Sequence, residues 1–178
     1  MAFSVLCVCT ANICRSPMME VSFRRLTVGD DEITVHSAGS RGSQGRPADP
    51  TTVTVAAGFN LDLTAHASQP LTRELVDAAD LILCAEVEHL LSVVDKSPGA
   101  FAKTFLLLEL AAEPARRRHD ETLTEWVARN HTGRTPGDVM KTASRFALSD
   151  PYKQGNDKIR RAATQIVDAT ESIASSWT

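Results

Sequence analysis

Short apolar runs alternate along the chain with segments whose apolar residues recur at helical spacing. An apolar run that is rich in β-branched residues and bounded by turn residues is typical of a buried strand. Such runs predict four strands, over residues 3–8, 33–36, 81–84 and 103–108. Because strands that alternate with helices form parallel sheets covered on both faces, the pattern predicts an α/β fold.

Helical patterns follow the predicted strands. Ser16 and Pro17 suit the N-cap and first residue of a helix that ends at Gly29. Its inner face is expected to hold Met18, Val21, Ser22 and Leu26. Residues 37–50 contain three glycines and two prolines and are expected to be largely loop. Further helices are predicted over residues 50–57 (capped by Asp49), 71–79, 86–94 and 154–172.

Residues 111–147 do not fit the strand and helix alternation. They hold two helical patterns, one around Trp126 with Leu123 and one around Val139 with Phe146. We interpret the segment as a helical insertion within a single domain that spans residues 1–178. Trp126 is expected in the core, and the basic run 116–118 on the solvated face of a helix.

Composition narrows the function classes. The chain has 178 residues, of which 43% are hydrophobic and 23% charged, which is ordinary for a globular protein. Its net charge of −3 lacks the basic footprint of a nucleic-acid binder. No apolar run reaches the length of a membrane span, and no basic start marks a secretory signal. We therefore expect a cytoplasmic protein with neither nucleic-acid nor membrane partners.

The cysteines point to thiol chemistry. Their spacing fits neither a disulfide framework nor a zinc site, and Cys7 and Cys84 are expected to pack in the core. Cys9 follows the first predicted strand, Arg15 follows Cys9 after five residues, and Ser16 and Pro17 open the next predicted helix. A loop between a strand and a helix N-terminus can turn its N–H groups toward an anion.

These residues suit phosphoryl transfer. The N–H dipoles and the Arg15 cation favour the thiolate form of Cys9, to which Ser16 can donate a hydrogen bond. A guanidinium can bind two phosphoryl oxygens. A cysteine that takes a phosphoryl group also needs an acid for the leaving oxygen, and the candidate is Asp150, just before Pro151 and Tyr152.

Five segments in order resemble the low-molecular-weight protein tyrosine phosphatase family. They are C-T-A-N-I-C-R-S-P at 9–17, H-S-A-G at 36–39, G-R-P-A-D-P at 45–50, L-I-L-C at 81–84 and D-P-Y-K-Q-G at 150–155. The resemblance covers about residues 1–110 and 148–178. It implies a three-layer αβα sandwich with a four-stranded parallel sheet, and a metal-free two-step phosphatase without a cofactor.

The resemblance also implies roles for individual residues. Cys9 would be the nucleophile, Arg15 the phosphate clamp and Asp150 the acid and then the base. The phosphate would be held by the loop Thr10, Ala11, Asn12, Ile13, Cys14, Arg15 and Ser16. Asn12, Ser37 and His66 would hold the loop in shape, Tyr152 would be a pocket wall, and Cys14 could trap Cys9 as a protective disulfide. The partner would be a phosphorylated protein or peptide, and the oligomeric state is left open.

Departures from the family pattern sharpen these expectations. Ala11 stands where a glycine is common, which requires that its φ is not positive. Ser43 and Gln44 stand where an aromatic residue often stacks on the phosphotyrosine ring. Lys153 follows Tyr152 and could favour acidic peptides.

Three alternative functions remain open. A protein arginine phosphatase of the same fold carries Thr where this chain has Ile13, so apolar Ile13 favours tyrosine. A thioredoxin-coupled arsenate reductase needs two further cysteines near the third strand, where only Cys84 is present. A non-catalytic phosphate-binding or redox-sensing module needs no acid, whereas Asp150 is present. The remaining histidines are expected to be surface or packing residues: His36, His89, His119 and His131.

Overall fold

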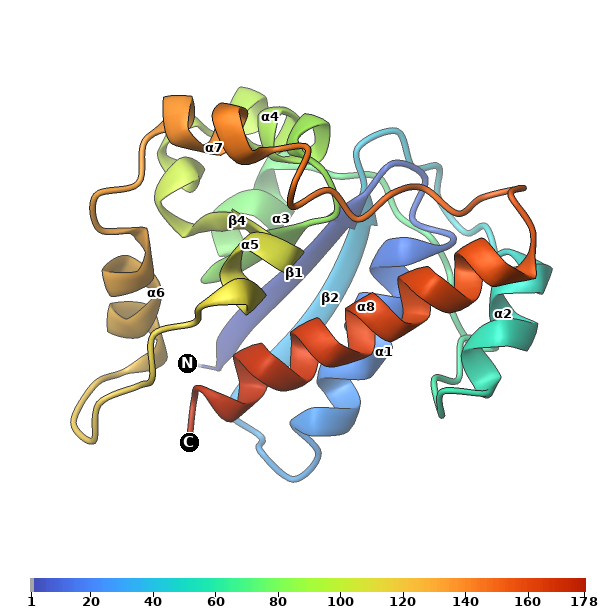
Figure 1. Ribbon diagram of the computed structural model, residues 1–178, viewed down its shortest axis with the longest axis horizontal. Coiled ribbons are helices and arrows are strands. Elements are labelled where there is room, and N and C mark those ends of the chain that lie inside the picture. Colours follow the sequence, from blue (N-terminus) through green and yellow to red (C-terminus); the bar gives the residue numbers. More distant parts are fainter. Residues whose placement is uncertain (1) are drawn as a thin grey trace.

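A computed structural model describes residues 2–178 (Figure 1). All four strands are parallel and form one sheet in the order β2-β1-β3-β4. The strands are β1 (Phe3–Cys9), β2 (Ile33–Gly39), β3 (Leu81–Cys84) and β4 (Thr104–Leu106). The helices are α1 (Arg15–Leu26), α2 (Pro50–Ala57), α3 (Arg73–Ala78), α4 (Val87–Lys96), the 3-10 turn η1 (Pro98–Lys103), α5 (Leu107–Ala112), α6 (Leu123–His131), α7 (Pro136–Thr142) and α8 (Asn156–Ser175). The predicted four-stranded parallel sheet with helices is confirmed.

Two apolar layers cover the sheet. Val5 and Cys7 of β1 point to one layer, together with buried residues of α1 and α8. Leu6 and Val8 point to the other, which is completed by α3 and α4. In Figure 1 the long red helix α8 runs beside α1 across the face of the sheet. The alternation of β1 therefore places Cys7 in the core, as the sequence predicts.

The start of α1 differs from the prediction. The helix begins at Arg15 with Cys14 as its N-cap, so Ser16 lies in the first turn, and its Oγ lies 3.0 Å from Cys9 Sγ. Pro17 is tolerated in that turn because its missing N–H would have had no partner inside the helix. The prediction that Leu26 is buried was also wrong: Leu26 is exposed, while Met19 and Phe23 are buried.

Other boundaries moved by a few residues. Ser37–Gly39 continue β2 instead of starting the loop. β4 is shorter than predicted because Leu107 already begins α5, whose Glu109 accepts a hydrogen bond from the Leu106 backbone N–H at 3.2 Å. The helix predicted over residues 71–79 is the shorter α3. The helix over 50–57 capped by Asp49 is confirmed.

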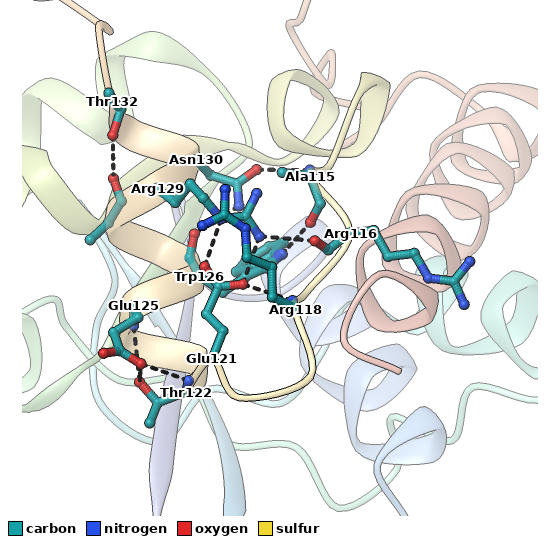
Figure 2. Close-up of polar contacts among 11 residues, drawn as sticks. Ala115, Arg116, Arg118, Glu121, Thr122, Glu125, Trp126, Arg129, Asn130 and Thr132 are labelled. Carbon is teal, nitrogen blue, oxygen red and sulfur yellow. Dashed lines mark hydrogen bonds and ion pairs between the residues drawn. The ribbon is translucent and has the colours of Figure 1, made fainter.

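The segment 111–147 contains two helices, α6 and α7, as predicted, but α7 ends at Thr142, so Phe146 lies in the turn that follows it. The basic run Arg116–Arg118 precedes α6 in an irregular loop, so the prediction that it lies on a helix was wrong. Figure 2 shows this loop folded back onto α6. Arg129 of α6 donates to both carboxylate oxygens of Glu121 at 2.6 Å and to the Arg116 carbonyl at 2.9 Å. This hydrogen bonding lowers the pKa of Glu121 to about 2.

Trp126 joins α6 to the main core. Its side chain is fully buried, and its ring packs edge-on against Trp177 with centroids 6.1 Å apart. Its indole N–H donates to the Ala115 carbonyl (Figure 2). The prediction that Trp126 is a core residue is confirmed. Across the described residues, no helix combines the length and apolarity that a membrane span requires.

Candidate active site

The loop after β1 lies at the carboxyl edge of the sheet, between β1 and β3. The chain leaves β1 for α1 on one face and leaves β3 for α4 on the other, and such divergence opens a binding crevice in α/β folds. Gly39 at the end of β2 allows the close approach of this loop, because a Cβ there would lie 2.9 Å from the carbonyl carbon of Ala11. The glycine that ends the H-S-A-G segment thus leaves the space that the loop occupies.

A cavity of about 240 Å³ opens above the loop. It is lined by Cys9, Thr10, Ala11, Ile13, Cys14, Arg15, Asp150 and Tyr152. The three residues predicted to be catalytic thus meet at one cavity although Asp150 is remote in sequence. Ala11 is not among the described residues with positive φ, which meets the condition set by its replacement of glycine.

A chain of hydrogen bonds runs from a buried carboxylate to the sulfur of Cys9. Ser37 donates to Glu20, and the Asn12 amide N donates to Ser37 Oγ at 2.8 Å and to Ser16 Oγ at 2.9 Å. Ser16 Oγ lies 3.0 Å from Cys9 Sγ. Ser16 accepts from Asn12, so its own hydrogen can be donated to a Cys9 thiolate, whose only competitor among the described residues is the Ala38 carbonyl oxygen at 3.5 Å.

Asn12 holds the turn of the loop. It has φ of 56°, a left-handed conformation that asparagine tolerates better than most residues. Its Oδ1 accepts from the Gln69 backbone N–H at 2.9 Å, and its carbonyl oxygen lies 2.7 Å from His66 Nε2. The structure therefore brings Ser37 and His66 to the loop, outside the cavity itself. Sequence reasoning missed Gln69 and the buried Glu20.

Arg15 is almost completely buried and reaches both sides of the cavity. Its Nη1 donates to Glu86 Oε2 at 2.5 Å and to the Leu148 carbonyl at 2.8 Å. Its Nη2 lies 3.5 Å from Asp150 Oδ2. Its Nε is buried and has no hydrogen-bond partner within residues 2–178. A buried donor without a partner is costly unless a ligand supplies the acceptor.

Asp150 and Tyr152 form the outer wall. The Asp150 side chain is 46% exposed and does not cap α8, whose N-cap is Gly155. Ser43 and Gln44 do not line the cavity, and Tyr152 is the one aromatic side chain among the described residues that does. Lys153 Nζ lies 5.2 Å from the Tyr152 ring centroid.

The other thiols are held as neutral groups. Burial raises the pKa of Cys14 to about 12, and its Sγ lies 2.7 Å from Thr52 Oγ1. Burial also raises the pKa of Cys7 and of Cys84. These directions agree with the prediction that Cys7 and Cys84 are core residues.

Two site residues at the start of α4 escaped sequence reasoning. Glu86 pairs with Arg15, and the buried His89 lies 2.9 Å from Thr10 Oγ1 through its Nε2. The prediction that His89 only packs was incomplete. The available signal was an acidic residue and a histidine three positions apart, directly after a buried strand. Burial and the charges of Arg15 and Arg41 lower the pKa of His89 to about 4.

The same helix start holds a cluster of potential metal donors. Glu86, Glu88 and His89 bring ligand atoms within 4.8 Å of one another, the one such group within residues 2–178. Glu86 is already bound to Arg15, and both ring nitrogens of His89 have hydrogen-bond partners. We therefore assign no metal to this group.

Known proteins share both the sequence and the fold. The family profile described as low molecular weight phosphotyrosine protein phosphatase matches residues 4–125. The low molecular weight protein-tyrosine-phosphatase Etp of Escherichia coli K12 is 43% identical over 103 residues, which are 58% of this chain and 68% of Etp. The probable low molecular weight protein-tyrosine-phosphatase EpsP of Ralstonia nicotianae is 36% identical over 119 residues, 65% of this chain and 80% of EpsP.

Solved structures extend the likeness over nearly the whole chain. Vibrio vulnificus Wzb, solved with benzylphosphonate, superposes with a TM-score of 0.72 at 28% identity and covers 98% of this chain and 99% of its own. A YwlE arginine phosphatase shares the fold with a TM-score of 0.72 at 24% identity, over 97% of this chain and 94% of its own. The profile match spans more than half of the described residues and includes the cavity loop. The chain belongs to the low molecular weight phosphotyrosine protein phosphatase family.

Proposed function

We propose that this protein hydrolyses phosphotyrosine in phosphorylated proteins through a phosphocysteine on Cys9. The observation that carries the proposal is the single cavity shared by the Cys9 thiol, the Arg15 guanidinium and the Asp150 carboxyl. Relatives named as protein-tyrosine-phosphatases support the substrate. The proposed reaction uses only side chains of this protein and water, and it calls for no metal or cofactor.

In the first step the Cys9 thiolate attacks phosphorus, and the bond from phosphorus to the tyrosine oxygen breaks. Protonated Asp150 gives its proton to that oxygen, so tyrosine leaves as a neutral phenol. In the second step the Asp150 carboxylate removes a proton from water as the water oxygen attacks phosphorus. The sulfur–phosphorus bond then breaks, which releases inorganic phosphate and restores the thiolate.

The surrounding groups stabilise charge during both steps. The unpartnered Nε of Arg15 is available for a phosphoryl oxygen, while Glu86 and the Leu148 carbonyl fix the other end of the guanidinium. The Ser16 hydroxyl supports the sulfur when it carries negative charge. Such preorganised donors account for much of the rate enhancement in enzymes that stabilise anions.

Trapping of the intermediate tests the proposal. Rapid quenching with a ³²P-labelled aryl phosphate should leave label on the protein, and Cys9→Ser should turn over no substrate. Asp150→Asn should slow hydrolysis of a phosphotyrosine peptide by roughly 100- to 10,000-fold, the usual worth of a general acid. Near-native activity of Cys9→Ser would rule the mechanism out.

Tyrosine is the favoured leaving group over arginine. Ile13 is buried in the cavity wall and Tyr152 lines the other side, so the walls are apolar around the position of a phenyl ring. The arginine phosphatase alternative rests on the shared fold. A phosphoarginine substrate would bring a guanidinium into the cavity, and that cation needs acidic partners. Asp150 is the one acidic side chain among the described cavity residues, and the proposed reaction already uses it as the acid.

An acidic flanking sequence in the substrate is a finer part of the proposal. A groove of about 560 Å³ adjoins the cavity and shares Asp150 with it. The groove is lined by Lys158, Arg160 and Arg161 of α8, none of which forms an ion pair within residues 2–178. Together with Lys153, these cations support the preference for acidic peptides that the sequence suggests.

A further inference from the structure

His89 contacts the loop after β1 at Thr10, although it does not itself line the cavity. It is 1% exposed and occupies the first turn of α4. Its Nδ1 lies 3.0 Å from the Glu86 backbone nitrogen, and its Nε2 lies 2.9 Å from Thr10 Oγ1. The ring therefore bridges the start of α4 and the residue that follows the nucleophile.

The partners of His89 determine its tautomer. A backbone N–H can only donate, so Nδ1 of His89 must carry a lone pair and accept from Glu86. A neutral imidazole with a bare Nδ1 carries its hydrogen on Nε2. Nε2 is consequently the donor to Thr10 Oγ1. The lowered pKa of His89 agrees with a neutral ring in the folded protein.

Thr10 receives a second hydrogen bond from the catalytic arginine. Arg15 Nη2 donates to Thr10 Oγ1 at 3.2 Å, and a guanidinium has no acceptor. A hydroxyl oxygen has two lone pairs and one hydrogen. His89 and Arg15 occupy both lone pairs, so the Thr10 hydroxyl is left as a pure donor. Within residues 2–178 no acceptor takes up this hydrogen, and Thr10 lines the cavity.

We propose that the Thr10 hydroxyl donates to a phosphoryl oxygen in the cavity and that His89 is the positioning residue that turns Thr10 into a donor. The inference rests on the proposed phosphatase function and adds a side-chain contact to the backbone N–H groups that the sequence predicts for this loop. No covalent step changes, because Thr10 and His89 keep their protons throughout. The hydrogen bond acts on a charged phosphoryl group, where such bonds are strongest.

A double-mutant cycle tests the coupling between the two residues. The probes are the Kd for inorganic phosphate and kcat/KM for a small aryl phosphate. Thr10→Val should weaken phosphate binding by roughly 10- to 100-fold, the worth of one hydrogen bond to a charged group. Thr10→Ser, which keeps the hydroxyl, should recover most of that loss. His89→Ala should cause a smaller loss, because the hydroxyl is kept but can turn away.

Non-additivity is the decisive result. Because His89 acts through Thr10, the double variant Thr10→Val/His89→Ala should bind phosphate no more weakly than Thr10→Val alone. His89→Gln, whose amide can still donate toward Thr10, covers the case in which His89→Ala fails to fold. The matched control is Thr124→Val, a change of the same type at an exposed position of α6 outside the cavity.

A second readout separates phosphoryl donation from a general disturbance of Arg15. The rate at which neutral iodoacetamide alkylates Cys9, followed against pH, reports the thiolate and not the phosphate. Thr10→Val should leave this profile in place while phosphate binding falls. Additive losses in the cycle, unchanged phosphate binding in Thr10→Val, or a parallel shift of the alkylation profile would overturn the inference. If the wild-type protein fails to hydrolyse phosphotyrosine, the proposed function fails instead.

Discussion

Single hydrogen bonds whose direction is fixed decide the chemistry of this cavity. The backbone N–H of Gln69 identifies the oxygen of the Asn12 amide, so the amide nitrogen must donate to Ser16, and Ser16 can then donate to Cys9. The backbone N–H of Glu86 fixes His89 in the same way. Donors that cannot accept thus set the orientation of side chains several bonds away.

The buried His89 should make stability depend on pH. Its pKa is about 4 in the folded protein against 6.5 for a free histidine, so the unfolded chain binds the proton more tightly. Stability contributed by neutral His89 is therefore complete above pH 6.5 and is lost as the pH falls toward 4, with a slope approaching about 1.4 kcal/mol per pH unit. Urea unfolding of wild type and His89→Gln across this range measures it.

The difference between the two proteins isolates His89 from the carboxylates that titrate in the same range. The free energy of unfolding should fall more steeply in wild type than in His89→Gln. Parallel curves would show that His89 titrates alike in the folded and unfolded chains.

The second loop thiol should protect the nucleophile only slowly. Peroxide oxidises the Cys9 thiolate to a sulfenic acid, and the Cys14 thiol then displaces water to form the Cys9–Cys14 disulfide. Because the pKa of Cys14 is raised to about 12, little of it is thiolate, and the second step should lag behind the first. Mass spectrometry should find the disulfide, and dithiothreitol should restore activity. Inactivation that is equally irreversible in wild type and Cys14→Ala would contradict this prediction.

At the scale of elements, the site is built where strand ends and helix starts meet. β1 delivers Cys9, α1 delivers Arg15 and Ser16, and α4 delivers His89. Helix boundaries therefore matter: because α1 begins at Arg15 instead of Pro17, Ser16 lies inside the first turn, and its hydroxyl contacts the Cys9 sulfur instead of capping the helix. Sequence patterns located these elements but misplaced their ends by one to three residues. The ends are set by capping contacts, such as the hydrogen bond from the Leu106 backbone N–H to Glu109, which the spacing of apolar residues does not reveal.

Helix α6 should support stability without taking part in turnover. Trp126 is fully buried, so Trp126→Ala should cost roughly 3–5 kcal/mol of unfolding free energy. No residue of α6 lines the cavity, so kcat and KM for a small aryl phosphate should stay unchanged while the protein is folded. Thr124→Ala, on the exposed face of α6, is the control. A lower kcat without a lower melting temperature would show that α6 acts on the site.

At the scale of the molecule, the charge is uneven. The chain carries a net charge of −3, yet a groove beside the cavity presents Lys158, Arg160 and Arg161. Such a local field attracts acidic partners and weakens with salt. The family and fold follow from the sequence and its relatives, whereas the cytoplasmic location and the organisation as a single domain with residues 111–147 as an insertion stay predictions.

The groove should select substrates by charge. Wild type should hydrolyse a phosphotyrosine peptide with flanking glutamates several-fold faster, by kcat/KM, than the same peptide with glutamines, and salt should reduce the difference. Lys158→Gln/Arg161→Gln should abolish the preference. Arg116→Gln/Arg118→Gln removes the same charge from a loop outside the groove and should retain it. Equal effects of the two double variants would indicate a response to net charge alone.

How much of the site could be predicted depended on how its residues are spaced. Cys9 to Pro17 form one contiguous motif, and Asp150 stands in a second, so their order in the chain sufficed. Glu20, Glu86 and His89 act through contacts that form only when the sheet brings distant segments together. A buried acidic or histidine side chain carries no local pattern that separates it from a surface residue.

The side-by-side kcat/KM for a phosphotyrosine peptide and a phosphoarginine peptide tests the central claim most directly. Both peptides should be measured on one purified batch, with Cys9→Ser as the blank. We predict a large preference for phosphotyrosine and no turnover by Cys9→Ser, because Ile13 and Tyr152 form apolar walls around the leaving group. A preference for phosphoarginine would contradict the substrate, and turnover by Cys9→Ser would contradict the phosphocysteine.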